Sequence, residues 1–275
     1  ERPDIAFNIA EGLSGRGREG QVPSLLSMLG IPFTGSDATT LCIALDKALT
    51  KRVLWTHRVR TPHYEVVEPG KTRLTKALSF PVIVKPNCEG SSKGIGAVSI
   101  AEDRKALSEI LRRNHELYEG EMLVEEYVEG REFTVGILGN FASARVFPPM
   151  EIVFRQPTEG AHTVYSYPVK QDYTRYVRYE CPANLTEEQT REITDMARRA
   201  FNALNCRDFA RVDFRMGADG KMYFIEINPL PGLAPGYSDY PMLAQFSGVG
   251  YRELVRGVLD AAAKRLGRSV DRREL

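Results

Sequence analysis

The sequence has few of the residues that build scaffolds held together by disulfides or metal. Among 275 residues there are only four cysteines and four histidines. No C-x-x-C pair is formed by the cysteines, which are Cys42, Cys88, Cys181 and Cys206. The histidines form no H-E-x-x-H motif. Short spacings of these kinds mark disulfide frameworks and zinc sites. The sequence therefore predicts neither, and it favours a reducing, cytoplasmic compartment.

Long apolar runs and an excess of one charge are also absent. No run approaches the roughly 20 apolar residues of a membrane-spanning helix. The 37 basic and 36 acidic side chains leave a formal charge of +1, which removes the electrostatic argument for nucleic acid or an anionic membrane as partner. No Ser–His or Cys–His arrangement indicates a covalent nucleophile. The 43% hydrophobic content is typical of a globular protein with one to three cores.

The chain begins Glu1-Arg2-Pro3-Asp4, without an initiator methionine or a secretory signal pattern. A strand is predicted over residues 4–9, so ordered structure would begin almost at once. We therefore expect that an upstream segment precedes this sequence in the native protein.

Helix and strand signals alternate after that strand. A helix is predicted over 22–29, where Pro23 suits the first turn, and an extended segment over 30–36. Apolar residues at helical spacing predict one continuous helix over 39–55. Turn residues beyond it place a domain edge between about residues 40 and 60.

The middle of the chain is richer in strands. A β-branched strand is predicted over 80–85 and a helix over 103–113. The segments 121–128 and 132–138 resemble a paired strand system.

The C-terminal third gives the clearest local signals. Thr186 and Gln189 form a capping box in front of a strongly amphipathic helix. Two strands at 206–215 and 221–228 flank a hairpin turn, and an amphipathic helix is predicted over 251–266.

A G-x-G-x-x-G pattern occupies residues 15–20, and Asp37 follows at about the distance of a ribose-binding acid. This pattern raises the hypothesis of a nicotinamide-dependent oxidoreductase. However, five residues separate the predicted strand from the first glycine, whereas the fingerprint needs the glycines immediately after a strand. A charged surface turn explains the segment at least as well.

Residues 81–96 combine an apolar strand with a loop rich in donors. Lys85 ends the strand, and a lysine there is costly to bury unless it meets an anion. The loop at 89–94 offers backbone amides and hydroxyls that can surround phosphates. The order Gly-Lys-Ser/Thr does not occur within this segment, so it is not a P-loop. A plain surface hairpin is the alternative.

The predicted hairpin places four polar side chains on two neighbouring strands. Arg211 and Asp213 share one face of the first strand, and Glu226 and Asn228 share one face of the second. Three oxygen ligands suit Mg²⁺, which takes its other ligands from phosphates and water. The alternative is an exposed sheet face with an Arg–Asp pair. Asn228 runs directly into Pro-Leu-Pro-Gly, a rigid loop that can present amides to a ligand.

A strand and turn at 123–133 could line a planar ring, with backbone groups at the ring edge and an acid on ribose hydroxyls. A solvated, acidic edge strand is the alternative interpretation.

Six segments together resemble, in order and spacing, the ATP-grasp ligases, and most closely the D-alanine–D-alanine ligase family. They are GRGREGQVPSLLSMLGIPFTGS, LDKALTK, PVIVKPNCEGSSKGI, LVEEYVEGREFTVGILG, ARVDF and FIEINPLPGL, and the resemblance covers about residues 8–260. The resemblance implies an α/β (α+β) ATP-grasp fold, with ATP held between two α+β subdomains. The implied divisions are 1–45, a truncated N-terminal α/β domain; 46–128, the central subdomain; and 129–275, the C-terminal subdomain.

The resemblance gives ATP-binding roles to residues that match the family's motifs. Three lysines would contact phosphates, a loop would cover them, a strand end would hold adenine, and a glutamate would hold ribose. In that order the residues are Lys47, Lys85 and Lys170; Glu89, Gly90, Ser91 and Ser92; Glu125, Tyr127 and Val128; and Glu132.

The resemblance also implies the metal, catalytic and substrate residues. Two Mg²⁺ ions, with Mn²⁺ as an alternative, would be bound by Asp213, Glu226 and Asn228. Arg211 and the Gly232 amide would stabilise the tetrahedral intermediate, and Ser91 and Ser238 would help to bind the amino-acid substrates.

The implied activity is that of a cytoplasmic ATP-dependent ligase. It would form an amide bond between two amino acids through an acyl phosphate, as in peptidoglycan biosynthesis. The implied partners are small amino acids and a second copy of the chain, without nucleic acid or membrane. Other amino-acid or amine substrates remain an alternative, as does a nucleotide-binding homologue that has lost catalysis.

Several positions depart from the family's pattern. Gln171 follows Lys170 where tyrosine is usual, Glu126 stands where lysine is frequent, and Pro229 stands where threonine is common. The family's N-terminal glutamate for the substrate ammonium would precede this sequence. The ATP-binding half is therefore better supported than the amino-acid half.

Overall fold

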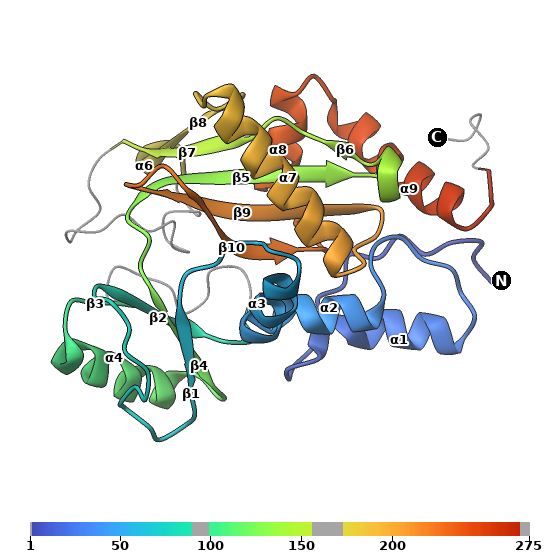
Figure 1. Cartoon of the computed structure of the whole chain (residues 1–275). Coiled ribbons are helices and arrows are strands. Elements are labelled where there is room, and N and C mark those ends of the chain that lie inside the picture. The colour runs from blue at the N-terminus through green and yellow to red at the C-terminus, as the bar shows by residue number, and fades with distance from the viewer. Residues whose placement is uncertain (1, 90–98, 156–172, 270–275) are drawn as a thin grey trace.

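The computed structural model describes residues 2–89, 99–155 and 173–269. It contains a four-stranded sheet, the small sheet, and a six-stranded sheet, the large sheet (Figure 1). All pairs in both sheets are antiparallel. The mixed α+β class predicted from the sequence is confirmed.

The small sheet has the strand order β1-β4-β2-β3. Its strands are β1 (Tyr64–Val67), β2 (Val82–Pro86), β3 (Ile100–Ala101) and β4 (Met122–Glu126). Helix α4 (Arg104–Leu117) covers one face, where it shares an apolar core with Val82 and Val84. Because side chains alternate along a strand, Lys85 points to the face that α4 leaves uncovered.

The large sheet has the order β10-β9-β5-β7-β8, and β6 also pairs with β5. Its strands are β5 (Gly130–Leu138), β6 (Arg145–Val146), β7 (Met150–Phe154), β8 (Val177–Glu180), β9 (Phe209–Gly217) and β10 (Met222–Asn228). The short helices η3 (Phe141–Ser143) and α6 (Tyr173–Tyr176) lie in its connections.

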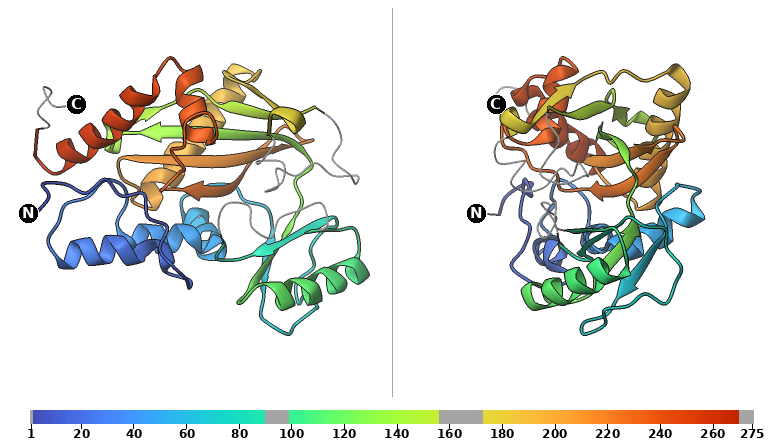
Figure 2. Two further views of the ribbon diagram at one scale, coloured as in Figure 1. Left: turned by 180° about the vertical axis from the view of Figure 1, so that it is seen from behind. Right: turned by 90° about the vertical axis from the view of Figure 1, so that its left-hand side faces the viewer.

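Helices cover both faces of the large sheet. In Figure 1, α7 (Glu187–Ala203) crosses the near face. The pair α8 (Asp239–Phe246) and α9 (Tyr251–Arg265) lies on the far face, which is seen from behind in Figure 2. The predicted capping box, hairpin and C-terminal helix are all confirmed.

Strand β9 carries the polar residues of interest because its two faces have different neighbours. Val212 and Phe214 are buried in the core that includes α7. Arg211, Asp213 and Arg215 alternate with them and therefore point from the opposite face. One strand thus contributes to the core and presents three charged groups to the same side.

The N-terminal segment differs from its prediction at the start. Of residues 4–9, only Ala6 is bridged, in an isolated parallel pair with Phe33, so the predicted strand is wrong. A strand needs a ladder of hydrogen bonds, and the described chain offers this segment a partner at one position. The turn η1 (Arg18–Gly20) and helix α1 (Gln21–Met28) follow, and α1 confirms the predicted helix.

The helix predicted over 39–55 is divided in two. Helices α2 (Ala38–Leu45) and α3 (Lys47–Thr56) meet at Asp46, whose ψ of 98° is not helical. The Asp46 side chain accepts a hydrogen bond from the Leu49 amide, which is the geometry of an N-cap. The apolar period continues across this break, so periodicity alone did not reveal it.

The strands predicted to pair at 121–128 and 132–138 lie in different sheets. β4 pairs with β1 and β2, whereas β5 pairs with β6, β7 and β9. Residues 127–129 therefore carry the chain from the small sheet to the large one. Alternation identifies a strand but not its neighbour, which is why this prediction failed.

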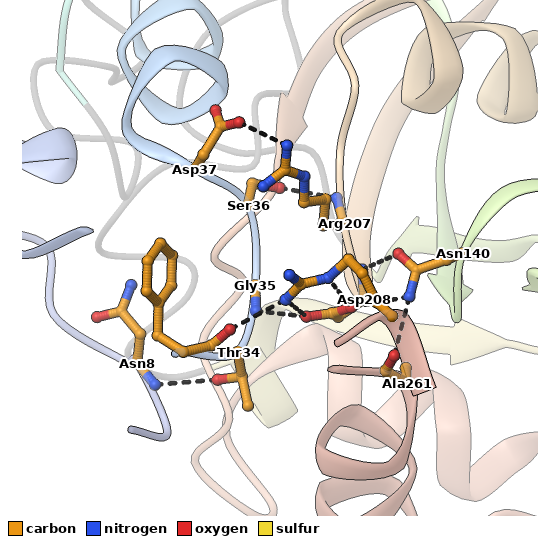
Figure 3. A network of polar contacts seen from close by, with 11 residues as sticks. Asn8, Thr34, Gly35, Ser36, Asp37, Asn140, Arg207, Asp208 and Ala261 are labelled. Atoms are coloured by element: carbon orange, nitrogen blue, oxygen red, sulfur yellow. Dashed lines mark hydrogen bonds and ion pairs between the residues drawn. The ribbon is translucent and has the colours of Figure 1, made fainter. Parts of the chain in front are cut away.

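A buried polar network joins distant parts of the chain at the start of β9 (Figure 3). Asp208 is fully buried and accepts from the Gly35 amide at 2.8 Å, from Asn140 Nδ2 at 2.8 Å and from Arg265 Nη2 at 2.7 Å. Arg265 also donates to the carbonyl of Phe33. The network ties the N-terminal segment, the large sheet and α9 together.

Across the described residues, no helix combines the length and the apolarity needed to cross a membrane.

Candidate active site

A cavity of about 310 Å³ lies where the N-terminal segment meets the β9–β10 hairpin and the loop before α8. The predicted site residues that line it are Lys47, Glu89, Arg211, Glu226, Asn228, Gly232 and Ser238. We call this space the first cavity. Residues predicted for phosphate, metal, catalysis and substrate therefore meet in one place.

Arg211 lines this cavity at the centre of three carboxylates, of which Glu226 and Asp239 also line the cavity and Asp213 does not. Its Nη2 is 2.8 Å from Asp213 Oδ2 and 3.8 Å from Glu226 Oε1, and its Nη1 is 3.4 Å from Asp239 Oδ2. Burial alone would lower the pKa of Arg211, but the carboxylates of Asp213 and Asp239 outweigh it and raise the pKa above its ordinary value. The guanidinium is therefore a fixed charge, held in place before any substrate binds.

The hairpin supplies an oxygen donor set that fits Mg²⁺. Glu226 lies directly opposite Asp213, and Asn228 lies opposite Arg211. Two carboxylates and one amide oxygen leave several positions for phosphate and water, as Mg²⁺ prefers. Among the described residues, no group of three or more His, Cys, Asp and Glu side chains could hold a metal ion. A metal at this hairpin would therefore depend on oxygen atoms of the nucleotide.

The loop from β10 to α8 brings Gly232 close to Ser238. A Cβ atom built on Gly232 would lie 2.7 Å from Ser238 Oγ, so a larger residue there would require the Ser238 hydroxyl to move. Ser238 precedes α8 but makes no side-chain capping bond. Its hydroxyl and the Gly232 backbone are therefore held close together at the wall of the first cavity.

Helix α3 brings two lysines to the uncovered face of the small sheet. Lys47 Nζ donates to the Glu89 carbonyl at 2.5 Å, and burial lowers the pKa of Lys47. One turn later, Lys51 Nζ lies 3.0 Å from Glu125 Oε2, while Lys85 Nζ lies 2.5 Å from Glu125 Oε1. Burial alone would raise the pKa of Glu125, but the two lysines lower it to about 2. Glu125, predicted for adenine, thus directs both carboxylate oxygens at lysines.

The residues predicted for the nucleoside are linked by an arginine that sequence analysis did not single out. Arg215 Nη1 lies 3.2 Å from Glu132 Oε2, and its Nη2 donates to Tyr127 Oη and the Gly130 carbonyl, each at 3.1 Å. The guanidinium also lies over the Tyr127 ring, 4.8 Å from its centroid. Arg215 therefore fixes Glu132 relative to the segment between the sheets.

Tyr127 and Val128 do not line the first cavity. They line a second one of about 860 Å³, together with Tyr64 and Tyr223, on the segment that connects the two sheets. The two cavities share no lining residue. Tyr127 and Val128 thus line a different cavity from the predicted catalytic residues Arg211 and Gly232, and Glu125 lines neither.

Four predicted site residues, Gly90, Ser91, Ser92 and Lys170, lie outside the described residues. The phosphate loop and the third phosphate-binding lysine therefore remain predictions from the sequence.

Several charged residues near the site were missed by the sequence analysis, namely Glu11, Glu19, Lys51, Arg215 and Asp239. Simple spacing could have indicated two of them. Lys51 follows Lys47 by one helical turn, and Arg215 follows Asp213 by one strand period. Glu19 lies within the glycine-rich segment at 15–20, and Glu11 lies shortly before it. The sequence pattern of this segment suggested a charged turn.

Glu19 gives the site a pH-dependent contribution to stability. Burial raises its pKa to about 7, against the charge of Arg18. Since the unfolded chain loses this proton near pH 4.5, the native state is penalised as pH rises from 4.5 to 7. We expect Glu19→Gln to raise the free energy of unfolding by about 1–3 kcal/mol at pH 8 and by far less at pH 4.5.

Urea unfolding of the nucleotide-free protein at both pH values measures this difference. Glu109→Gln, at an exposed position of α4, serves as the control and should show no pH-dependent change. An equal effect of Glu19→Gln at both pH values would contradict the prediction.

Comparison with known proteins identifies relatives of most of the chain. Residues 57–260 match the family model described as "D-ala D-ala ligase C-terminus". A D-alanine–D-alanine ligase of Bordetella pertussis is 37% identical over 255 residues, which are 91% of this chain and 77% of that protein. An uncharacterised protein of Sinorhizobium fredii, y4sG, is 34% identical over 95% of this chain and 75% of its own length.

A solved structure supports the same relationship. The crystal structure of D-alanine–D-alanine ligase from Bacillus anthracis complexed with ATP matches with a TM-score of 0.76 and 26% sequence identity, covering 95% of this chain and 80% of that one. The ATP-grasp fold predicted from the sequence is therefore confirmed. With its family model, its relatives and its fold in agreement, the chain belongs to the D-alanine–D-alanine ligase family.

Proposed function

We propose that this protein is an ATP-dependent ligase that joins two D-alanine molecules and releases ADP and phosphate. The first cavity is the observation that carries the proposal, because Lys47, Arg211 and Glu226 converge there beside the loop at 232–238. The family relationship supports the choice of D-alanine, and the ATP-complexed relative supports ATP as the nucleotide.

The first step is phosphoryl transfer to a carboxylate. A carboxylate oxygen of the first amino acid attacks the γ-phosphorus of ATP, the bond to the bridging oxygen breaks, and ADP leaves as an acyl phosphate forms. Lys47 and Lys85 provide positive charge for the phosphates. Mg²⁺, when bound by Asp213, Glu226 and Asn228, would neutralise further phosphate charge.

The second step forms the amide bond. The amine of the second amino acid attacks the acyl carbon, negative charge develops on the carbonyl oxygen, phosphate leaves, and the nitrogen loses a proton. Arg211 is fixed by its carboxylate neighbours, so it stabilises this oxygen without reorganising during the reaction. The Gly232 amide and the Ser238 hydroxyl lie at the same wall and orient the substrates.

The proposal includes the wider expectations from the resemblance. The small sheet falls within the proposed subdomain at 46–128 and the large sheet within 129–275, which supports these divisions. A homodimer, a cytoplasmic location and a part in peptidoglycan synthesis belong to the same proposal.

An assay of nucleotide turnover on the full native chain tests the function. We expect release of ADP and phosphate only when D-alanine, ATP and Mg²⁺ are all present, with D-alanyl-D-alanine identified by mass spectrometry. A panel of other amino acids and small amines tests the substrate. Turnover with another pair alone would replace D-alanine, whereas tight ATP binding without turnover on any pair would indicate a catalytically silent homologue.

A further inference from the structure

Lys51 is completely buried, and its charge has no role in the mechanism described above. Its side chain is 0% exposed. The ammonium group lies 5.9 Å from the centroids of both the Tyr64 ring in β1 and the Phe224 ring in β10. Burial lowers the pKa of Lys51, and Glu125 opposes this effect. Burying a cation costs free energy, so the groups that surround the Lys51 ammonium indicate its role.

The contact of Lys51 with Glu125 is part of a three-residue arrangement. Glu125 is 2% exposed and holds Lys51 on one carboxylate oxygen and Lys85 on the other. Lys85 itself is 3% exposed. The three side chains therefore carry a net charge of about +1 in a region of low dielectric, where that charge acts strongly on nearby anions.

Lys51, Lys85 and Glu125 lie next to the residues predicted to bind the ATP phosphates. Lys85 is the penultimate residue of β2, and the strand leads directly into residues 87–89, where the Glu89 carbonyl accepts from Lys47 Nζ. The α3 N-terminus is fixed to the same place, because the Asn87 carbonyl and Asn87 Oδ1 accept from the Lys47 and Ala48 amides. Lys47, Lys51 and Lys85 thus form one rigid unit with the end of β2.

We propose that Lys51 is a positioning residue for nucleotide binding, which shares Glu125 with Lys85 and so keeps the positive charge of Lys85 available to the phosphates. This inference rests on the proposed function, because it requires that ATP binds here. Without Lys51, Glu125 would neutralise Lys85 completely and could turn about its side-chain bonds. Lys51 therefore acts on the nucleotide through Glu125 and touches no reacting atom.

Charge sharing makes an unusual prediction for three variants. Lys51→Met leaves a neutral Lys85–Glu125 pair, and we expect Kd and KM for ATP to rise about 10-fold or more while kcat changes less. Lys51→Arg keeps the charge and should recover much of the affinity. In Lys51→Met/Glu125→Gln the net charge is again about +1, so this double variant should bind ATP more tightly than Lys51→Met alone.

Calorimetric titration with ATP and Mg²⁺, together with KM and kcat, provides the measurement. Lys105→Met, at an exposed position of α4, is the control and should match the wild type. The slope of log Kd against log salt concentration should be shallower for Lys51→Met than for the wild type, since fewer charges act on the phosphates.

The outcomes separate this inference from the function itself. If the wild type does not bind ATP, the proposed function fails first. If the wild type binds but Lys51→Met binds equally well, or the double variant binds more weakly than Lys51→Met, charge sharing is wrong. The second result would instead show that the Glu125 carboxylate contacts the nucleotide directly. Should Lys51→Met not fold, Lys51→Arg and the double variant are compared with the wild type instead: charge sharing predicts a Kd for ATP near the wild-type value in both, and a Kd raised about 10-fold in both folded variants would overturn it.

Discussion

Replacing Arg211 by methionine is expected to lower kcat by about 10²–10³, the effect of removing one preorganised group from a developing oxyanion. The KM for ATP should change far less. Arg211 contacts three carboxylates at or beside the first cavity. In the proposed mechanism the lysines, and not Arg211, attract the triphosphate. The expected loss therefore falls on the amide-forming step.

Loss of Arg211 also removes one cation from the carboxylates of Asp213 and Asp239, so stability must be measured alongside activity. The side chains of Asp213 and Asp239 are 18% and 8% exposed. Arg211→Lys retains the charge but lacks the planar group that contacts Asp213 through two nitrogens, so we expect an intermediate kcat and a smaller loss of stability.

Steady-state kinetics with D-alanine and ATP, and thermal unfolding of the same samples, measure both effects. Arg178→Met removes an arginine whose ion pair with Glu180 lies on the exposed part of β8, and it should leave kcat unchanged. A normal kcat in a folded Arg211→Met protein would remove Arg211 from the mechanism.

Replacing Asp208 by asparagine is expected to destabilise the protein by about 3–5 kcal/mol without altering the first cavity directly. Asp208 is fully buried, and its two oxygens accept from Gly35, Asn140 and Arg265. Asparagine turns one acceptor into a donor that faces other donors, and it leaves the largely buried Arg265 without its counter-ion.

The melting temperature should fall by roughly 10 °C, as expected for such a loss in a domain of this size. Calorimetry or circular dichroism measures the shift. Asp195→Asn is the matched control, because Asp195 pairs with Arg199 on the exposed side of α7 at 2.8 Å, where an ion pair contributes about 0.5 kcal/mol or less. A similar melting temperature for Asp208→Asn and Asp195→Asn would show that the network in Figure 3 contributes little.

The most local part of the site was the part that sequence could predict. Arg211, Asp213, Glu226 and Asn228 lie on one hairpin, and the pairing of its strands follows from a four-residue turn. Strand alternation alone then places their side chains. The register shift between Phe224 and Glu226 was not predicted, because a bulge changes the pairing without changing the composition of the strand.

Contacts between distant segments could not be predicted in the same way. The alternating pattern of β4 and β5 was recognised, but their separation into two sheets depends on which other strands compete for each edge. The division of α2 from α3 depends on Asp46, which binds Asn87 and Arg16 as well as capping a helix. Such partners lie far apart in sequence.

The sequence by itself determined the α+β class, the hairpin with its oxygen-bearing side chains, and the apolar strand that contains Lys85. These features follow from periods of two and of 3.6 residues and from neighbours along the chain. Only the tertiary structure decided that Lys51 and Lys85 share Glu125, and that Asp208 meets Gly35 across 173 positions. Charged groups in the interior must be paired, because an unpaired buried charge costs too much free energy. Which groups meet there depends on how distant segments pack, and no local sequence pattern specifies that.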